Sequence, residues 1–263
     1  MNHSTDREQY ADATIDAIAS AVLSRQPLPP MTCSIVDDGY RVQRALTAQL
    51  NAGRGGDLKA GVTATSTQQQ LGIDGPLAAS LYVDGRLESG CTLTVTEGQE
   101  LECEIAVITD GSGKPLGLMP AVEVVYLAFS RAEDLSIANA VAANLGADRY
   151  ICSEVVRWDE SLTQVPICVC RDGVEIATMS NSYSFGSPAS GAAWLVDEGR
   201  KRGLWSDSEQ QRVLLLGTCG DPIPARPGQY RIDFGPLGTV DFILVQSRLE
   251  TSEGNNPDNW SGT

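Results

Sequence analysis

Apolar and polar positions follow two different periods along this chain. Residues 6–24 place apolar side chains at helical spacing, and three prolines follow by residue 30, so we predict a helix that ends there. A second helix is predicted after Asp37, which we expect to be its N-cap. The glycine-rich segment 51–57 then predicts a turn. The chain therefore begins with two helices.

Short strands dominate beyond this turn. Strands are predicted over 91–96, 101–108, 122–127, 166–170, 174–179, 212–217, 229–234 and 238–246, with further helices at 134–145 and 189–201. This order favours an α+β fold over a regular βαβ alternation. We expect an N-terminal helical layer (1–57), a β-rich core (58–250) and a disordered tail (251–263).

Composition narrows the possible partners and chemistry. Asp plus Glu number 34 against 19 Lys plus Arg, and the net charge of −15 argues against nucleic acid and anionic membranes as partners. The single histidine, His3, lies at the start of the chain, so chemistry would rest on carboxylates, hydroxyls, thiols or the few lysines. The chain shows neither signal-peptide features nor a long apolar run, and its seven cysteines are scattered. We therefore expect free thiols and a cytoplasmic location.

Three glutamates are candidates for a metal site. Glu102 and Glu104 are two positions apart in a predicted strand, so both side chains point to one face. Two adjacent carboxylates repel unless they are solvated, protonated or bridged by a cation. A solvent-facing strand is the alternative. Glu123 lies in an apolar run, where a buried carboxylate needs a partner, although it would need none on the wet face of an alternating strand.

Lysine and glycine positions suggest a cleft. Lys59 precedes a β-prone run, and Gly61 would let the backbone pass close to a ligand, although most lysines are simply solvated. The turn 217–220 follows an apolar strand. It would either offer backbone amides to an anionic substrate or only reverse the chain.

Several segments resemble the hydratase and decarboxylase branch of the fumarylacetoacetate hydrolase superfamily. The resemblance begins with Lys59-x-Gly61-x-Thr63 and the segment 68–76 (QQQLGIDGP), and covers roughly residues 6–246. The other matching segments are Asp38 to Gln43, Glu102 to Ala106, Val122 to Val125, Ile137 to Asn144, Gly186 to Leu195, Leu216 to Thr218 and Pro227 to Gly238.

The resemblance implies a fold, a metal and a substrate class. The implied fold is a mixed, rolled β-sheet core with N-terminal helices. The implied activity is that of a divalent-metal-dependent lyase of the 2-keto-4-pentenoate hydratase type, which acts on a 2-oxo acid or its dienol. The resemblance also implies a homo-oligomer. Mg or Mn would be held by Glu102, Glu104 and Glu123. The catalytic residues would be Lys59 and Asp74, and the substrate-binding residues Gly61, Leu77, Tyr126, Ser187 and Thr218.

The chain also departs from this branch. Only 19 positions separate Glu104 from Glu123, an interval in which the family usually has a further helix, and Leu77 and Tyr126 stand where acids are common. The losses put water activation in question. They leave open a hydratase or decarboxylase, a repurposed cyclase or isomerase on the same scaffold, and a non-catalytic partner subunit. Specificity is expected from loops around 74–88 and 181–190.

Overall fold

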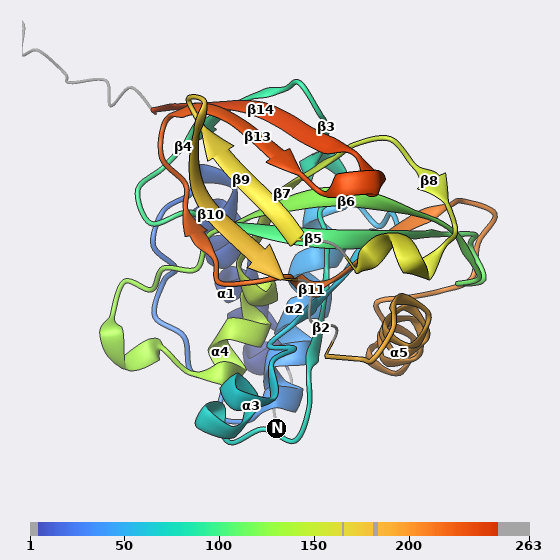
Figure 1. Ribbon diagram of the computed structural model, residues 1–263. Helices are drawn as coiled ribbons and strands as arrows, with labels where there is room; N and C mark the ends of the chain where they lie inside the picture. Colours follow the sequence, from blue (N-terminus) through green and yellow to red (C-terminus); the bar gives the residue numbers. More distant parts are fainter. Residues whose placement is uncertain (1–4, 165, 181–183, 247–263) are drawn as a thin grey trace, which may run out of the picture.

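The computed structural model describes residues 5–164, 166–180 and 184–246 (Figure 1). The helices in this part of the chain are α1 (Thr5–Ser24), α2 (Val36–Leu50), α3 (Thr65–Leu71), α4 (Ile137–Ala142) and α5 (Pro188–Arg202). The strands up to the middle of the chain are β1 (Leu58–Gly61), β2 (Leu77–Ser80), β3 (Arg86–Glu88), β4 (Thr92–Val95), β5 (Glu100–Thr109), β6 (Pro115–Val125) and β7 (Ala147–Cys152). The later strands are β8 (Val156–Arg157), β9 (Pro166–Arg171), β10 (Val174–Ser180), β11 (Arg212–Thr218), β12 (Ile223–Pro224), β13 (Gly228–Asp233) and β14 (Thr239–Gln246).

These strands form two stacked sheets. The larger sheet has nine strands and runs in the order β2-β1-β11-β5-β6-β7-β3, with β12 paired to β5 and β8 paired to β6. The smaller sheet runs in the order β10-β9-β13-β14-β4. The larger sheet mixes parallel pairs, such as β1 with β11, with antiparallel pairs, such as β5 with β6. The predicted α+β class with a mixed, curled sheet is confirmed.

Alternation along β5 assigns its two faces to different cores. Leu101, Cys103 and Ile105 are buried in the core that joins the two sheets. Ala106 and Ile108 face the opposite side, where they share a second core against α1 and α2. In Figure 1 the smaller sheet lies above the larger one and α1, α2 and α4 lie below it. Glu102 and Glu104 have the parity of the helix-facing side of β5.

The helices depart from the sequence predictions at their ends. The N-cap of α2 is Ile35 rather than Asp37, which lies in the first turn, where its charge favours the helix dipole without capping it. The helix predicted over 134–145 shortens to α4, because 3-10 turns occupy residues 132–134 and 144–146. Side chains of α4 pack with those of α1 and α2, so the helical layer also includes a segment beyond residue 57. The domain boundary itself stays a prediction.

The strand predictions were too few and partly misplaced. The strand predicted over 122–127 begins earlier, at Pro115, and ends at Val125. Several short strands and one helix were not predicted: β1, β2, β3, β7, β8, β12 and α3. Elements of two to seven residues carry too few positions to show a period, so the sequence does not reveal them.

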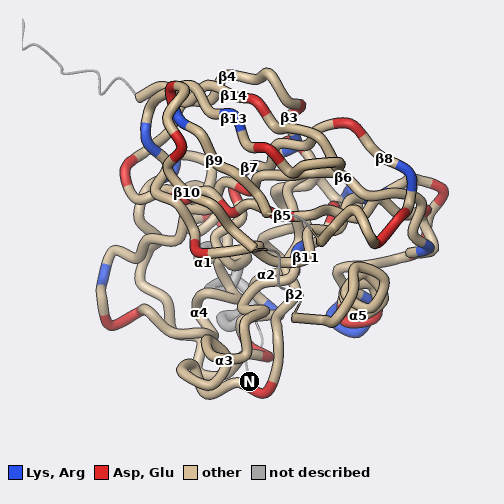
Figure 2. The backbone as a smooth tube through the Cα atoms, viewed as in Figure 1, with Lys and Arg blue, Asp and Glu red and all other residues tan. Residues whose placement is uncertain are grey.

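Other predictions have simpler outcomes. The charged residues are distributed along the chain rather than gathered in one block (Figure 2). All seven cysteines are free thiols, as expected. No helix among the described residues has the length and hydropathy to cross a membrane. His3 and the predicted tail over 251–263 lie outside the described residues.

Candidate active site

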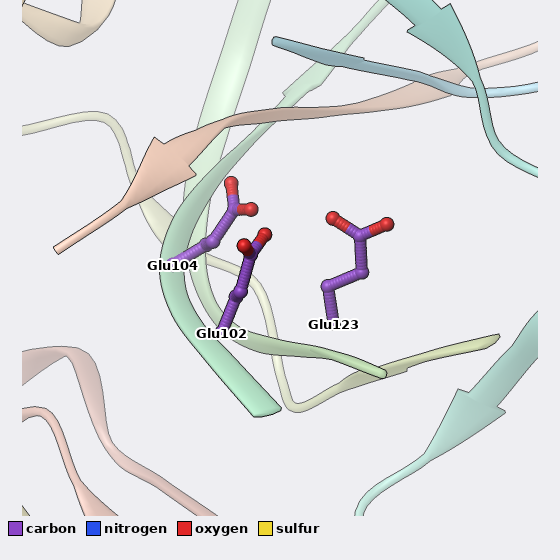
Figure 3. Close-up of side chains that lie close together, drawn as sticks. All are labelled: Glu102, Glu104 and Glu123. Carbon is purple, nitrogen blue, oxygen red and sulfur yellow. The ribbon is translucent and has the colours of Figure 1, made fainter. Parts of the chain in front are cut away.

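Pairing between β5 and β6 brings the three glutamates together. Glu102 lies directly opposite Glu123 in the antiparallel register, and Glu104 follows two positions along β5. One carboxylate oxygen from each residue lies within 4.8 Å of the others, and Figure 3 shows the three carboxylates gathered on one side of the sheet. Glu104 and Glu123 are fully buried, and Glu102 is half-buried. These three residues are called the glutamate cluster below.

Lys59 lies against the glutamate cluster. Its neighbours Leu58 and Ala60 point into the core between the sheets, so the lysine points to the opposite face, which carries the glutamates. Its Nζ donates a hydrogen bond to Glu123 Oε1 at 2.6 Å, and both side chains are almost completely buried. Strand β11 lies between β1 and β5, so this contact crosses the sheet. The long lysine side chain makes the crossing possible.

Gly217 on β11 contributes to the site through its backbone. It lies where the pairing of β11 with β5 shifts register, between Leu215 and Thr218. Its φ of +102° disfavours any other residue, and an added Cβ would lie 2.5 Å from Thr63 Oγ1. The Gly217 amide donates to Glu104 Oε2 at 2.7 Å. The strand-end turn therefore directs this amide at a buried glutamate, which neither sequence alternative anticipated.

A strained turn after α4 provides a second contact for Lys59. Asn144 and Leu145 both have positive φ, near +56° and +51°, which is costly for residues with side chains. The Asn144 amide group bonds both the N–H and the C=O of Ser80, which holds the turn in place. The Leu145 carbonyl then lies 3.4 Å from Lys59 Nζ. At Gly61 an added Cβ would lie 2.7 Å from the end of the Leu145 side chain, which would have to move aside.

The cluster has uncompensated charge and unused acceptors. When all four groups are ionised, three carboxylates and one ammonium leave two negative charges without a partner. Glu104 Oε1 and Glu123 Oε2 are buried and accept no hydrogen bond from an N–H or hydroxyl of the described residues. Buried oxygens of this kind are costly. A divalent cation prefers carboxylate oxygens and would match both the charge and the free acceptors, so the residues fit such an ion.

Burial and mutual repulsion perturb the titration of these groups. Burial, reinforced by the neighbouring glutamate charges, raises the pKa of Glu104 well above its usual range. Burial also raises the pKa of Glu123 to about 7, although Lys59 opposes the rise. Burial lowers the pKa of Lys59, but the surrounding glutamate charges outweigh it and raise that pKa overall. The lysine therefore stays charged beside its carboxylate.

A cleft of about 660 Å³ opens beside the cluster, and Lys59 and Glu102 form part of its lining. Gly61 and Thr218, both expected at the substrate site, line it too. The Thr218 hydroxyl donates to the Gly220 carbonyl and so fixes the turn at the cleft wall.

Four other expected site residues do not line this cleft. Asp74 is exposed, and Leu77 is buried against Tyr40. Tyr126 lines a separate small hollow, and Ser187 caps α5. Their assignments therefore rest on the resemblance alone.

The cleft also contains residues that the sequence did not single out. Asp221 follows the 217–220 turn, and Ser184, a described residue of the expected 181–190 loop, also belongs to the lining. Three leucines from separate segments, Leu71, Leu127 and Leu135, complete much of the wall. Residues 74–88 were expected to form a loop that sets specificity, but none of them belongs to the described lining of the cleft. The sequence signals for these residues were the turn before Asp221, the expected 181–190 loop and the matching segment 68–76, which contains Leu71.

Comparison with known proteins shows which proteins the chain resembles. No family model matches the chain. The chain is 24% identical to 2-keto-4-pentenoate hydratase of Paraburkholderia xenovorans over 88% of its length and 94% of the relative. It is 25% identical to 2-keto-4-pentenoate hydratase 2 of Dechloromonas aromatica over 92% of its length and all of the relative. The structure of 4-oxalocrotonate decarboxylase from Pseudomonas putida G7, complexed with magnesium and adipate, matches with a TM-score of 0.76 and 20% identity. This match covers 91% of the present chain and 98% of that chain.

The chain shares the fold of this decarboxylase, with the expected curled mixed sheet. The resemblance to the hydratase and decarboxylase branch of the fumarylacetoacetate hydrolase superfamily is confirmed as a resemblance. The same decarboxylase was also solved with calcium and acetate. Within this fold the sheet carries the glutamate cluster, and the helices and loops on its helix side build the cleft.

Proposed function

We propose that this protein is a divalent-metal-dependent lyase that acts on a 2-oxo acid or its dienol, as a hydratase or a decarboxylase. The observation that carries the proposal is the glutamate cluster, with two free buried oxygens, beside a charged lysine in a cleft. Relatives named as 2-keto-4-pentenoate hydratases, and a structural match to a decarboxylase, support the same class.

The metal-binding residues would be Glu102, Glu104 and Glu123, with Mg or Mn as the ion. Such an ion would polarise the 2-oxo group and stabilise negative charge on the substrate. Glu102 lines the cleft and would present the ion to the substrate, whereas the other two glutamates lie behind it, buried in the sheet.

Lys59 would act on the substrate directly. Its ammonium uses two acceptors, Glu123 and the Leu145 carbonyl, and can direct one more N–H to an oxygen in the cleft. A charged lysine at this place would bind the substrate carboxylate or transfer a proton to carbon as charge develops. Glu123 holds the ammonium in position, so metal binding and lysine placement depend on one side chain.

The decisive experiment combines metal dependence with substitution. Purified protein is treated with EDTA, then assayed on a 2-hydroxydienoate and on 4-oxalocrotonate with Mg or Mn restored. We expect EDTA to abolish turnover and metal to restore it. The double variant Glu102→Gln, Glu104→Gln should be inactive with metal, whereas Asp84→Asn, an exposed acid outside the cleft, should be unaffected. Full turnover by the double variant would disprove the mechanism.

An isomerase or cyclase on the same scaffold is the second candidate. It is favoured by the positions of Asp74, Leu77 and Tyr126, which leave the cleft without the acids that the branch usually supplies there. Turnover of neither substrate by a protein that binds metal tightly would favour this candidate. A partner subunit without activity would show neither metal binding nor turnover.

A further inference from the structure

The cleft is larger than a small 2-oxo acid requires. Its volume of about 660 Å³ corresponds to roughly twenty waters at the density of the liquid. A five-carbon acid bound at the glutamate cluster would fill only part of that space. The remaining volume must therefore be occupied either by solvent or by the tail of a longer substrate.

Apolar side chains surround much of this remaining volume. Leu71, Leu127 and Leu135 line the cleft with exposed fractions of 45%, 37% and 70%. Ile137 and Leu145 add half-buried apolar surface to the same wall. Large apolar side chains gathered around one cleft provide a favourable surface for a ligand that is itself apolar.

The charges in the cleft disfavour a second carboxylate. Among the described lining residues Lys59 is the only cation, and Glu123 already pairs with it. The acids in the lining are Glu102, assigned to the metal, and Asp221, which would repel a distal anion. A carboxylate placed against this wall would lose water without gaining a positive partner.

We propose that the site prefers 2-oxo monocarboxylates with a bulky apolar tail and discriminates against dicarboxylates. The head group binds at the metal and Lys59, and the tail packs against the leucines of the wall. This preference rests on the proposed function. It goes beyond that proposal by fixing the substrate's distal chemistry.

Binding to the Mg-loaded full-length protein separates the two proposals. Calorimetry would compare oxalate, which has only the head group, with pyruvate, 2-oxoheptanoate and 2-oxoadipate. We expect oxalate to bind, and 2-oxoheptanoate to bind more than tenfold tighter than pyruvate, since each buried methylene contributes roughly fourfold. 2-Oxoadipate should bind at least tenfold more weakly than 2-oxoheptanoate. If oxalate fails to bind, the proposed function and the preference both fall. If oxalate binds but the two longer acids bind equally, the preference alone falls.

A single substitution tests the wall itself. Leu135→Arg adds a cation at an exposed lining position, so it should shift the ratio of the two affinities at least tenfold toward 2-oxoadipate. Leu116→Arg is the matched control, because Leu116 is also exposed but lies in β6 outside the cleft lining. Its ratio should equal that of the unmodified protein. An unchanged ratio in Leu135→Arg, or an equal change in both variants, would overturn the proposal.

Discussion

Replacing Lys59 by methionine tests the charge balance of the site. The substitution keeps most of the apolar side chain and removes only the ammonium. Lys59 and Glu123 are 3% and 0% exposed and lie 2.6 Å apart, so the variant leaves a buried carboxylate without its partner. Removing one member of a buried ion pair costs about 3–5 kcal/mol. At about 2–4 °C per kcal/mol for a chain of this size, the Tm should fall by about 6–20 °C without metal.

The same variant should respond more strongly to metal. Loss of the ammonium raises the uncompensated charge of the glutamate cluster from two to three, which strengthens its attraction for a divalent cation. Binding to the folded state alone stabilises the protein as the ratio of metal to Kd grows. Millimolar Mg should therefore raise the Tm of Lys59→Met by more than it raises that of the unmodified protein. Turnover should still be lost, because the metal does not replace the ammonium that is proposed to bind the substrate or to donate a proton.

Scanning calorimetry with and without Mg measures both effects. Lys201→Met is the matched control, since Lys201 is two-thirds exposed and pairs with Glu198 on the surface of α5. Such a surface substitution should change stability by no more than about 0.5 kcal/mol. If Lys59→Met lowers the Tm no more than this control, or gains no extra stability from Mg, the buried pair is not the element that balances the cluster.

Three further predictions concern the same site. The folded pKa values of the buried Glu104 and Glu123 lie above their unfolded values, so without metal their ionisation should lower the Tm as pH rises from about 5 to 8. With Mg this decrease in Tm should be smaller. An equal slope of Tm against pH with and without Mg would contradict the prediction. Gly217→Ala should lower the Tm by more than Gly72→Ala, because both glycines have positive φ but only a Cβ at Gly217 would meet a neighbouring side chain. Gly217→Ala alone should also reduce the increase in Tm that Mg gives. Asp74→Asn should retain turnover within about tenfold in steady-state assays, because this exposed carboxylate does not line the cleft. A loss of turnover approaching a hundredfold, the lower range of general acid–base catalysis, would show that Asp74 is a catalytic residue.

Local patterns predicted part of the glutamate cluster. A two-residue spacing within a strand is enough to place Glu102 and Glu104 on one face, and the structure confirms this placement. Local sequence also predicts which face of β5 carries the two glutamates, because Cys103 between them points into the core on the other face. The proximity of Glu123 depends on register between two strands, which a five-residue hairpin loop sets and no local period reveals. The Lys59 contact depends on a parallel pairing between residues more than 150 positions apart.

The expected role of Tyr126 shows where the resemblance stops being informative. β6 ends at Val125, and its pairing with β7 shifts register between Val124 and Val125. The following residue then leaves the sheet. Tyr126 enters a hollow beside Arg25 and Asp148, away from the cleft. A matching position in an alignment gives a residue's place along the chain, but a register shift of this kind decides which side of the sheet its side chain reaches.

The proposed metal-binding arrangement and the stability of the fold are coupled through one set of contacts. Lys59 and the Gly217 amide each serve one buried glutamate, yet two acceptor oxygens stay without a donor. Mutual repulsion is therefore built into the centre of the larger sheet, where β11, β5 and β6 lie side by side. Replacing Glu102 and Glu104 with glutamine, which leaves the Lys59–Glu123 pair intact, should relieve that repulsion and raise stability without metal, even as it removes metal binding. Three carboxylates this close together cost the fold stability, and that cost supports the proposed chemical role for this part of the sheet.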